Sequence, residues 1–260
     1  MSIELTNQCV LVTGASSGIG KACAEAFAAR GSRLLLVARR SDRLEELAKE
    51  LGDRNNTEVS TSTLDVRDRG AVDSWVQGLA PEWQEIDVLV NNAGLSRGLS
   101  PLHEGEVEDW EEMIDTNVKG LLYVTRAVLP GRVERGSGHV INIGSIAGHE
   151  VYPGGTVYCA TKHAVTALNR GLGIDTLGTG VRVSSVDPGM VETEFSIVRF
   201  RGDSERAESV YDGLEALRSD DVAEAVVFCA TRPPHANVRE MILMPTAQAA
   251  AVFSHRTEEE

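Results

Sequence analysis

Tyr158 and Lys162 are two side chains whose types and spacing could transfer a proton. They stand four positions apart, and because this is about one helical turn, both are expected on the same face of a helix. A phenol titrates near pH ~10 and is therefore a weak acid–base catalyst at neutral pH. A neighbouring ammonium favours the phenolate, so Lys162 is expected to lower the pKa of Tyr158. The same spacing also occurs on ordinary solvated helices, so the hypothesis needs support from other motifs.

A glycine-rich segment near the N-terminus predicts a nucleotide site. Residues 13–20 read Thr-Gly-Ala-Ser-Ser-Gly-Ile-Gly and lie between an apolar strand pattern and a helical pattern at 21–30. The backbone N–H groups of such a turn, with the positive end of the helix dipole, can bind a pyrophosphate. Gly14 permits the tight turn, Gly18 the close approach of a phosphate, and Gly20 the packing of helix on strand. The spacing differs from the general G-x-G-x-x-G fingerprint.

Two further motifs follow apolar strand patterns. Residues 91–94 read Asn-Asn-Ala-Gly, and Ser145 ends another apolar run, thirteen positions before Tyr158 (158 − 145). Both are expected where the carboxyl ends of central strands meet a cofactor. With the Tyr-x-x-x-Lys pair and Pro188-Gly189, in this order and spacing, the chain resembles the short-chain dehydrogenase/reductase superfamily. The resemblance covers about residues 7–244.

The resemblance implies a role for each catalytic candidate. Tyr158 would protonate a carbonyl oxygen in reduction and deprotonate an alcohol in oxidation, and Lys162 would also bind the nicotinamide ribose. Ser145 would donate a hydrogen bond to the substrate oxygen where charge develops. Asn117 matches the family's fourth member, which holds a water that relays protons to Lys162. Asn117 is expected in a helix, where its side chain could instead merely bond backbone.

The resemblance also implies where the cofactor binds. The carboxamide of the nicotinamide would meet the backbone of Val191 and the hydroxyl of Thr193, and Asp65 with Val66 matches the adenine-edge position. Asp65 could alternatively be a simple turn residue. The full set of implied cofactor positions is Gly14, Ser16, Ser17, Gly18, Ile19, Gly20, Asp65, Val66, Asn92, Ala93, Gly94, Tyr158, Lys162, Pro188, Gly189, Val191 and Thr193.

Two arginines indicate which dinucleotide is used. Arg39 and Arg40 follow the second strand pattern, where an NAD-selective site places a carboxylate and an NADP-selective site accommodates a 2′-phosphate with arginine. The planar guanidinium presents a fork of donors suited to phosphate. The sequence therefore predicts NADP, or NADPH, as the cofactor. The alternative is that the two arginines are only a solvated pair.

Composition and charge limit the other classes of protein to which this chain could belong. The net charge is −14 and argues against nucleic-acid binding. Four dispersed cysteines without C-x-x-C spacing are expected to be reduced packing residues, and six histidines without ligand spacing predict no metal. No signal-peptide pattern is visible and the apolar runs are too short for a bilayer, so a cytoplasmic protein is expected.

Short apolar segments alternating with helical patterns position these motifs. The strands are expected at 10–13, 33–38, 59–64, 88–91, 139–143, 182–186 and 241–244. Their continuous hydrophobicity predicts a parallel α/β sheet covered by helices on both faces, a single Rossmann-fold domain over residues 1–260. The resemblance implies the strand order 3-2-1-4-5-6-7 and a homotetramer.

We make a separate prediction for each of two segments outside the sheet. A lid is expected at about 191–219, between the sixth and seventh strands. Residues 246–253 are expected to pack on another subunit, and about 254–260 to be disordered.

The substrate is the least constrained feature. Segments around Trp110, Thr125, Tyr152, Glu194 and Pro234 resemble the bacterial NADP-dependent 3-hydroxy acid (serine) dehydrogenases. These oxidise small 3-hydroxy acids such as serine and 3-hydroxyisobutyrate, and a related branch reduces sulfoacetaldehyde. Cys159, in place of an expected glycine, and the tail depart from that pattern.

A small anionic substrate needs a nearby cation. Arg199, Arg201 and His149 are candidates for this cation, and Ser145 and Tyr158 would hold the substrate oxygen. The alternative enzyme is a generalist carbonyl or aldehyde reductase with a larger apolar pocket. A catalytically silent NADP sensor would need a broken Ser/Tyr/Lys set, which this chain does not have.

Overall fold

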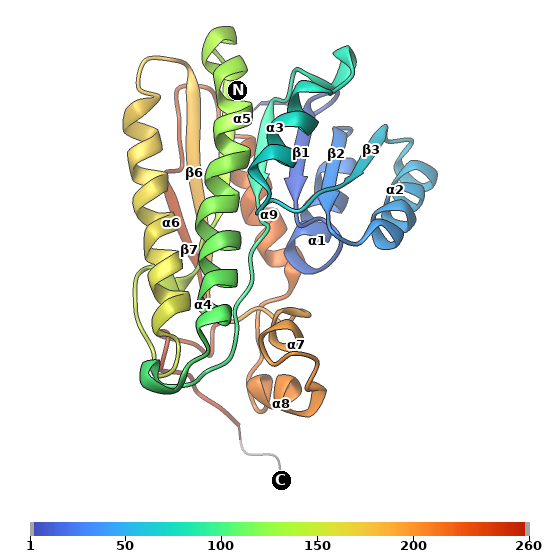
Figure 1. The fold of residues 1–260 in the computed structure, drawn as a ribbon. Coiled ribbons are helices and arrows are strands. Elements are labelled where there is room, and N and C mark those ends of the chain that lie inside the picture. The colour runs from blue at the N-terminus through green and yellow to red at the C-terminus, as the bar shows by residue number, and fades with distance from the viewer. Residues whose placement is uncertain (1–2, 258–260) are drawn as a thin grey trace.

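A parallel sheet forms the centre of the computed structural model, which describes residues 3–257 (Figure 1). Its seven strands lie in the order β3-β2-β1-β4-β5-β6-β7, as predicted. Each predicted strand is present, and its ends differ from the prediction by no more than two residues. The strands are β1 (Cys9–Thr13), β2 (Arg33–Ala38), β3 (Val59–Thr63), β4 (Val88–Asn91), β5 (Gly138–Ile143), β6 (Val181–Pro188) and β7 (Glu240–Leu243).

Burial on both faces explains why the central strands are continuously apolar. All residues of β1 and β4 are buried, and β1 pairs in parallel with β2 on one side and with β4 on the other. The edge strand β3 reads Val-Ser-Thr-Ser-Thr and is only partly buried, in keeping with its single neighbour. The strand order therefore reverses at β1, which places the crevice for a ligand at the carboxyl ends of β1 and β4.

Helices cover both faces of the sheet (Figure 1). On one face, Phe27, Leu44 and Val226 pack into one apolar cluster with the central strands. On the other face, Val72 and Val124 join a second cluster with Leu11 and Leu89. The first face carries α1 (Gly18–Ala28), α2 (Ser41–Asn55) and α9 (Ser219–Ala230), and the second carries α3 (Arg69–Gln77), α5 (Leu121–Arg135) and α6 (Thr156–Asp175).

The helix α4 (Val107–Ile114) runs directly into a π-helical stretch, Asp115–Gly120, before α5 begins. Gly120 is needed in that stretch because a Cβ there would overlap with the side chain of Val66. Stretches of π-helix are rare and concentrate at functional sites. This one carries Asn117 into the interior of the molecule.

The predicted lid contains two short helices, α7 (Phe195–Arg199) and α8 (Ser204–Glu208), which lie together beyond one end of the sheet (Figure 1). The loop after β4 anchors the lid through a hydrogen bond from the backbone N–H of Gly98 to the carbonyl of Arg199 (3.0 Å). This contact holds the segment against the rest of the domain, and its role as a lid stays a prediction.

The expectation of disorder from residue 254 is wrong for residues 254–257. His255 N donates to Ala247 O (2.7 Å), and Thr257 N donates to Gly213 O (2.9 Å), so backbone pairing holds this stretch against the end of the lid. Residues 258–260, the rest of that prediction, lie outside the described residues. The subunit contact predicted for residues 246–253 stays a prediction; Phe253 in this segment is 70% exposed.

Candidate active site

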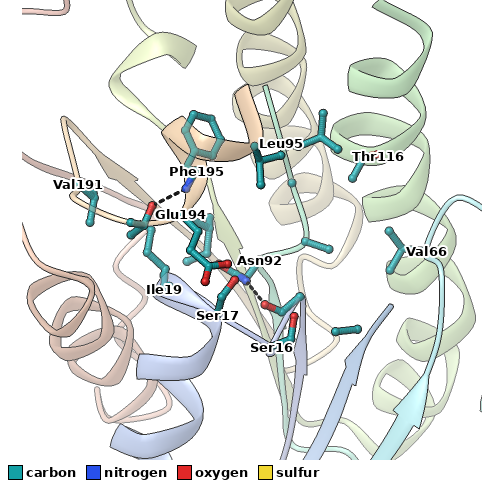
Figure 2. A pocket seen from close by; sticks show the side chains of 18 of the residues that line it. Ser16, Ser17, Ile19, Val66, Asn92, Leu95, Thr116, Val191, Glu194 and Phe195 are labelled. Atoms are coloured by element: carbon teal, nitrogen blue, oxygen red, sulfur yellow. Dashed lines mark hydrogen bonds between the residues drawn. The ribbon is translucent and has the colours of Figure 1, made fainter. Parts of the chain in front are cut away.

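A cavity of about 340 Å³ opens at the carboxyl ends of the central strands. Its lining comes from the turn after β1, the end of β2, the loops after β3, β4 and β5, the helix α6 and the start of the lid, so distant parts of the chain meet in one place (Figure 2). With the exception of Gly20, every cofactor position implied by the sequence lines this cavity, as do Arg39, Arg40 and Ser145.

The glycine-rich turn is tight because its glycines have no side chains. Gly14 has φ +66° and Gly18 has φ +52°, a left-handed conformation that other residues adopt rarely. A Cβ on Gly14 would lie 2.9 Å from Ala93 Cα, and a Cβ on Gly20 would overlap with the side chain of Asn92. Asn92 Nδ2 in turn donates to Gly14 O (3.2 Å), which ties the turn to the end of β4 (Figure 2).

Arg40 lies across the entrance of the glycine-rich turn. Its Nη2 donates to Ser17 Oγ (2.7 Å) and Ser16 Oγ (3.1 Å), and its Nη1 donates to a carboxylate oxygen of Glu194 (3.0 Å). Arg39 is half exposed, and its Nη1 reaches a carboxylate of α4 only at 4.0 Å. The Arg39 guanidinium is therefore available at the end of β2, where an adenosine 2′-phosphate would lie, whereas that of Arg40 is held by Ser16, Ser17 and Glu194.

Asp65 lines the cavity at the predicted adenine end, but its carboxylate faces a neighbouring cation. Arg67 Nη2 donates to Asp65 Oδ2 (2.6 Å), and Arg67 Nε reaches both carboxylate oxygens at 3.0 Å. This side-chain hydrogen bonding lowers the pKa of Asp65 below its usual value, against the opposing effect of burial. Asp65 is thus held ionised by its own loop, which orders the wall beside Val66.

Tyr158, Lys162 and Ser145 meet at the inner end of the cavity. All three are buried, and the first two project from the same face of α6, as their spacing predicts. Lys162 Nζ donates to the carbonyl of Ile143 (2.9 Å) at the end of β5 and lies 5.9 Å from the Tyr158 ring centroid. Ser145 Oγ accepts a hydrogen bond from Ala147 N (3.1 Å), which fixes the hydroxyl at the end of its strand.

The expectation that Lys162 lowers the pKa of Tyr158 is wrong for this structure. Burial dominates and raises the pKa of Tyr158 well above that of a free phenol, while Arg199 and a hydrogen bond with Ser145 act weakly in the opposite direction. Burial also lowers the pKa of Lys162 to about 8, partly offset by the charge of Asp187. The local spacing predicted attraction between the two groups, whereas the removal of both from water has the larger effect.

Asn117 is buried, and its side chain is fully engaged. Its Oδ1 accepts from Leu95 N (2.8 Å), and its Nδ2 donates to Leu95 O (2.8 Å) and Thr161 Oγ1 (3.0 Å). The amide therefore clamps the loop after β4 to α6 close to Lys162. These contacts agree with the alternative that the side chain bonds backbone, although the backbone is that of the facing loop.

The segment that follows β6 forms the wall at the predicted nicotinamide end. Thr193 Oγ1 accepts from Phe195 N (3.2 Å; Figure 2), and the hydroxyl of Tyr211 donates to Val191 O (2.9 Å). The side chain of Gln248 accepts from Met190 N (2.8 Å). Residues from the lid and from the C-terminal segment thus fix the backbone that would meet a carboxamide.

Arg199 lies against the aromatic groups at the substrate end. Its Cζ lies 5.5 Å from the ring centroid of Tyr158, 5.1 Å from that of Phe195 and 6.0 Å from that of Tyr152. Its Nη2 donates to the Tyr152 hydroxyl (3.1 Å). Its Nε is buried and has no hydrogen-bond partner within residues 3–257. Unpaired buried donors are costly, so this nitrogen is a candidate contact for an anionic ligand.

The other two candidates for holding an anion have protein partners. His149 Nε2 pairs with a carboxylate oxygen of the fully buried Asp187 (2.7 Å). Arg201 is largely exposed and pairs with Asp109 of α4. Of the three candidates, Arg199 alone lies against Tyr158 among the contacts of the described chain.

Some residues of the site carried no recognisable signal in the sequence. Tyr152 and Asp187 act through contacts with Arg199 and His149 that no local spacing reveals. Glu194 and Phe195 directly follow Thr193, and this adjacency was the one available clue. The lining residues that were not predicted are Ala38, Leu64, Leu95, Thr116, Ile143, Gly144, Glu194, Phe195 and Val198.

Residues 3–257 contain neither a metal-binding cluster nor a helix suited to a membrane. No cluster of three or more histidine, cysteine or acidic side chains within residues 3–257 is arranged to hold a metal ion. In the same range, no helix combines the length and the apolar character of a membrane span. All four cysteines are buried.

Known proteins match this chain over nearly its whole length. The family model for short chain dehydrogenases matches residues 8–203. The NADP-dependent 3-hydroxy acid dehydrogenase YdfG of Salmonella typhi is 50% identical over 250 residues, covering 95% of this chain and 99% of that protein. Sulfoacetaldehyde reductase 2 of Chromohalobacter salexigens is 46% identical over 246 residues, 94% and 97% of the two chains. A solved structure of the closed form of serine dehydrogenase complexed with NADP+ superposes with a TM-score of 0.91 at 48% identity, covering 96% of this chain and 100% of that one.

Proposed function

The chain belongs to the short-chain dehydrogenase family, and we propose that it is an NADP-dependent oxidoreductase acting on a small 3-hydroxy acid of the serine or 3-hydroxyisobutyrate type. The observation that carries this proposal is that one cavity joins a catalytic group to a nucleotide end, with a cation beside its catalytic tyrosine. Tyr158, Ser145 and Lys162 are buried at its inner end, Arg40 lies at its nucleotide end, and Arg199 lies against the ring of Tyr158.

The residues of the cavity fit a phosphorylated dinucleotide. The left-handed Gly14 and Gly18 shape a tight turn whose later backbone N–H groups, at the start of α1, could bind a pyrophosphate, and Arg39 with Arg40 could bind a 2′-phosphate. Lys162 and Thr193 would hold the nicotinamide end. When bound, NADP supplies a site that accepts a hydride, or in its reduced form donates one.

The chain's own residues manage the proton. In reduction, the hydroxyl of Tyr158 donates its proton to the substrate oxygen, and the raised pKa of this phenol keeps that proton in place at neutral pH. Ser145 donates a second hydrogen bond to the same oxygen. In oxidation, Tyr158 must act as a phenolate, a state that the positive charge of Arg199 and the hydrogen bond with Ser145 stabilise.

The carboxylate of the substrate would bind Arg199. Its guanidinium has an unpaired buried Nε, and Tyr152 holds its Nη2. Phe195 lies edge-on to Tyr158 at 5.6 Å and lines the cavity beside it, an arrangement that we expect to favour a small substrate. A charged, enclosed pocket favours a small acid over the bulky apolar ketones of a generalist reductase.

A sulfonate is the second candidate class of substrate. A guanidinium binds a sulfonate with the same fork of donors as a carboxylate. The 46% identity to a sulfoacetaldehyde reductase supports this alternative, because sulfoacetaldehyde carries its carbonyl and its anionic group on a short carbon chain.

We also propose that the protein is a cytoplasmic homotetramer. Reduced, buried cysteines are typical of a cytosolic protein. Phe228 of α9 and Ile242 of β7 are large apolar side chains exposed on neighbouring elements, an arrangement suited to a subunit interface. Sedimentation or light scattering would give the mass directly, and a monomer at micromolar concentration would rule out the tetramer.

A substrate screen tests the main proposal. Reduction of NADP would be followed with serine, 3-hydroxyisobutyrate, 3-hydroxypropionate, isethionate and uncharged secondary alcohols. The expected result is turnover of the anionic compounds with kcat/KM well above that of the alcohols, and with NADP preferred to NAD. Preference for uncharged alcohols would instead support the generalist reductase.

A further inference from the structure

An ion-pair cluster at the nucleotide end of the cavity joins the predicted Arg40 to two residues without a predicted role, Arg43 and Glu194. Glu194, the residue before α7 in the lid, accepts hydrogen bonds from two arginines. Arg43 Nη1 donates to both of its carboxylate oxygens (2.7 and 2.9 Å), and Arg40 Nη1 donates to one of them (3.0 Å). Arg43 belongs to α2, so this carboxylate joins the lid to the end of β2 and the start of the next helix.

The carboxylate occupies a position close to the turn that would receive the cofactor. Figure 2 shows the side chain of Glu194 running from the lid toward Ser17. The remaining edge of the Arg40 guanidinium faces Ser16 and Ser17, with its Nε and Nη2 donating to their hydroxyls. Both edges of this guanidinium are therefore occupied, one by neutral hydroxyls and the other by an anion.

We propose that Glu194 is an intramolecular competitor for the 2′-phosphate of NADP, and that Arg43 belongs to the same charged site. This inference rests on the proposed role of Arg39 and Arg40 in binding that phosphate. A phosphate monoester carries nearly two negative charges at neutral pH, and it would share the Arg40 guanidinium with a carboxylate of the same sign. Glu194 thus weakens the binding of the phosphorylated cofactor and leaves the unphosphorylated one almost unaffected.

The charges around the carboxylate show how Arg43 takes part. Arg43 donates to both carboxylate oxygens, so it neutralises part of the charge that Arg40 and the phosphate would otherwise meet. Without Arg43, the carboxylate would bind Arg40 alone and compete more strongly. All three side chains are roughly 40% exposed, so solvent screens the interactions and the effects are expected to be moderate, about three- to tenfold in Kd.

Equilibrium binding to the full-length protein tests the proposal without any catalytic assay. NADPH and NADH are titrated into the wild type, Glu194→Gln and the matched control Glu192→Gln, whose exposed side chain has no ion pair within residues 3–257. The same titrations with 2′,5′-ADP and 5′-AMP, which lack the nicotinamide, isolate the phosphate end. Glu194→Gln should bind NADPH and 2′,5′-ADP about three- to tenfold more tightly. Its Kd for NADH and 5′-AMP should stay within about twofold, and Glu192→Gln should change neither.

A second variant checks the part assigned to Arg43. Arg43→Gln should weaken NADPH binding in the wild-type background, and the loss should shrink when Glu194→Gln is also present, because the charge that Arg43 neutralises is then gone. An equal loss of NADPH affinity in both backgrounds would overturn the proposed coupling between Arg43 and Glu194. Arg43 would then bind the phosphate directly.

Three results of the Glu194→Gln titration would overturn the competitor role. An equal loss of NADPH and NADH affinity would mean that the carboxylate only closes the lid. A selective loss of NADPH affinity would mean that it orients Arg40. Unchanged affinity for NADPH and NADH would mean that breaking the contacts of Glu194 with the arginines costs no binding free energy. If the wild type itself binds NADPH no more tightly than NADH, the cofactor proposal fails instead, and the two failures are thereby separated.

Discussion

Replacing Arg199 by methionine should separate recognition of substrate charge from the chemistry at Tyr158. The backbone of the lid stays anchored in this variant, because Gly98 N bonds the carbonyl of residue 199 and not its side chain. A carboxylate that loses a buried, charge-assisted guanidinium partner typically loses about 3 kcal/mol. At about 1.4 kcal/mol per factor of ten, kcat/KM for a 3-hydroxy acid should fall about 100-fold.

An uncharged alcohol provides the comparison, since it makes no ion pair with Arg199. For such a substrate, the variant loses only the effect of the cation near the Tyr158 ring, at 5.5 Å from its centroid. Contacts of this kind contribute about 0.5–1 kcal/mol, so the loss should be no more than about fivefold. The measurable quantity is the ratio of kcat/KM between the acid and the alcohol, which should fall by at least about twentyfold.

A matched control and a refuting result complete the test. Arg201→Met removes the same charge two positions away, where the side chain pairs with Asp109 on the surface, and should leave the ratio unchanged. Arg199→Lys keeps the charge without the fork and should give an intermediate ratio. If the acid and the alcohol lose activity equally in Arg199→Met, the arginine acts on Tyr158 and the assignment of the substrate anion is wrong.

Four other changes have defined outcomes. Tyr158→Phe should lower kcat/KM by about 10²- to 10⁴-fold with Kd for NADPH unchanged, and retained turnover would remove the acid–base role. Arg39→Ala combined with Arg40→Ala should raise Kd for NADPH about 10- to 100-fold and Kd for NADH much less, as measured by titration. Gly20→Ala should destabilise the protein by about 1–3 kcal/mol, visible as a lower Tm, because the added methyl overlaps with the turn. The pKa of Lys162 is lowered to about 8 in the folded protein, so the unfolded state binds more protons above that pH. Stability should therefore rise between about pH 8 and pH 10 by up to about 3 kcal/mol relative to Lys162→Met, and parallel unfolding curves would contradict this.

The sheet was predictable because each central strand is buried on both faces. A strand such as β2, whose residues from Leu34 to Ala38 are all buried, must be apolar throughout, and this leaves a mark in the sequence that needs no tertiary information. The tail at 254–257 was not predictable in the same way. Its order comes from backbone hydrogen bonds to Ala247 and Gly213 and from the Arg256 side chain, which donates to carbonyls more than forty positions away. A short polar stretch whose partners are distant in the chain looks the same in sequence as a disordered one.

The same distinction between local and tertiary information applies to the residues of the site. The glycine-rich turn and the Tyr158–Lys162 pair depend on local spacing, and the positions of both were predictable from the sequence. The pKa of Tyr158 depends on how much protein surrounds it, including Phe195 and Tyr152 from segments outside its helix. An estimate from the spacing alone included the attraction of Lys162 and omitted desolvation, and so it had the wrong sign.

The lid connects the two ends of the cavity through a single short helix. Glu194 immediately precedes α7 and reaches Arg40 at the nucleotide end, while Arg199 is the last residue of α7 and reaches Tyr158 at the other end. One helical turn therefore carries the contacts proposed to select both the cofactor phosphate and the substrate anion. It follows that substitutions of Glu194 and Arg199 should change the two preferences while the catalytic side chains are retained, because Ser145 comes from the loop after β5 and Tyr158 and Lys162 come from α6.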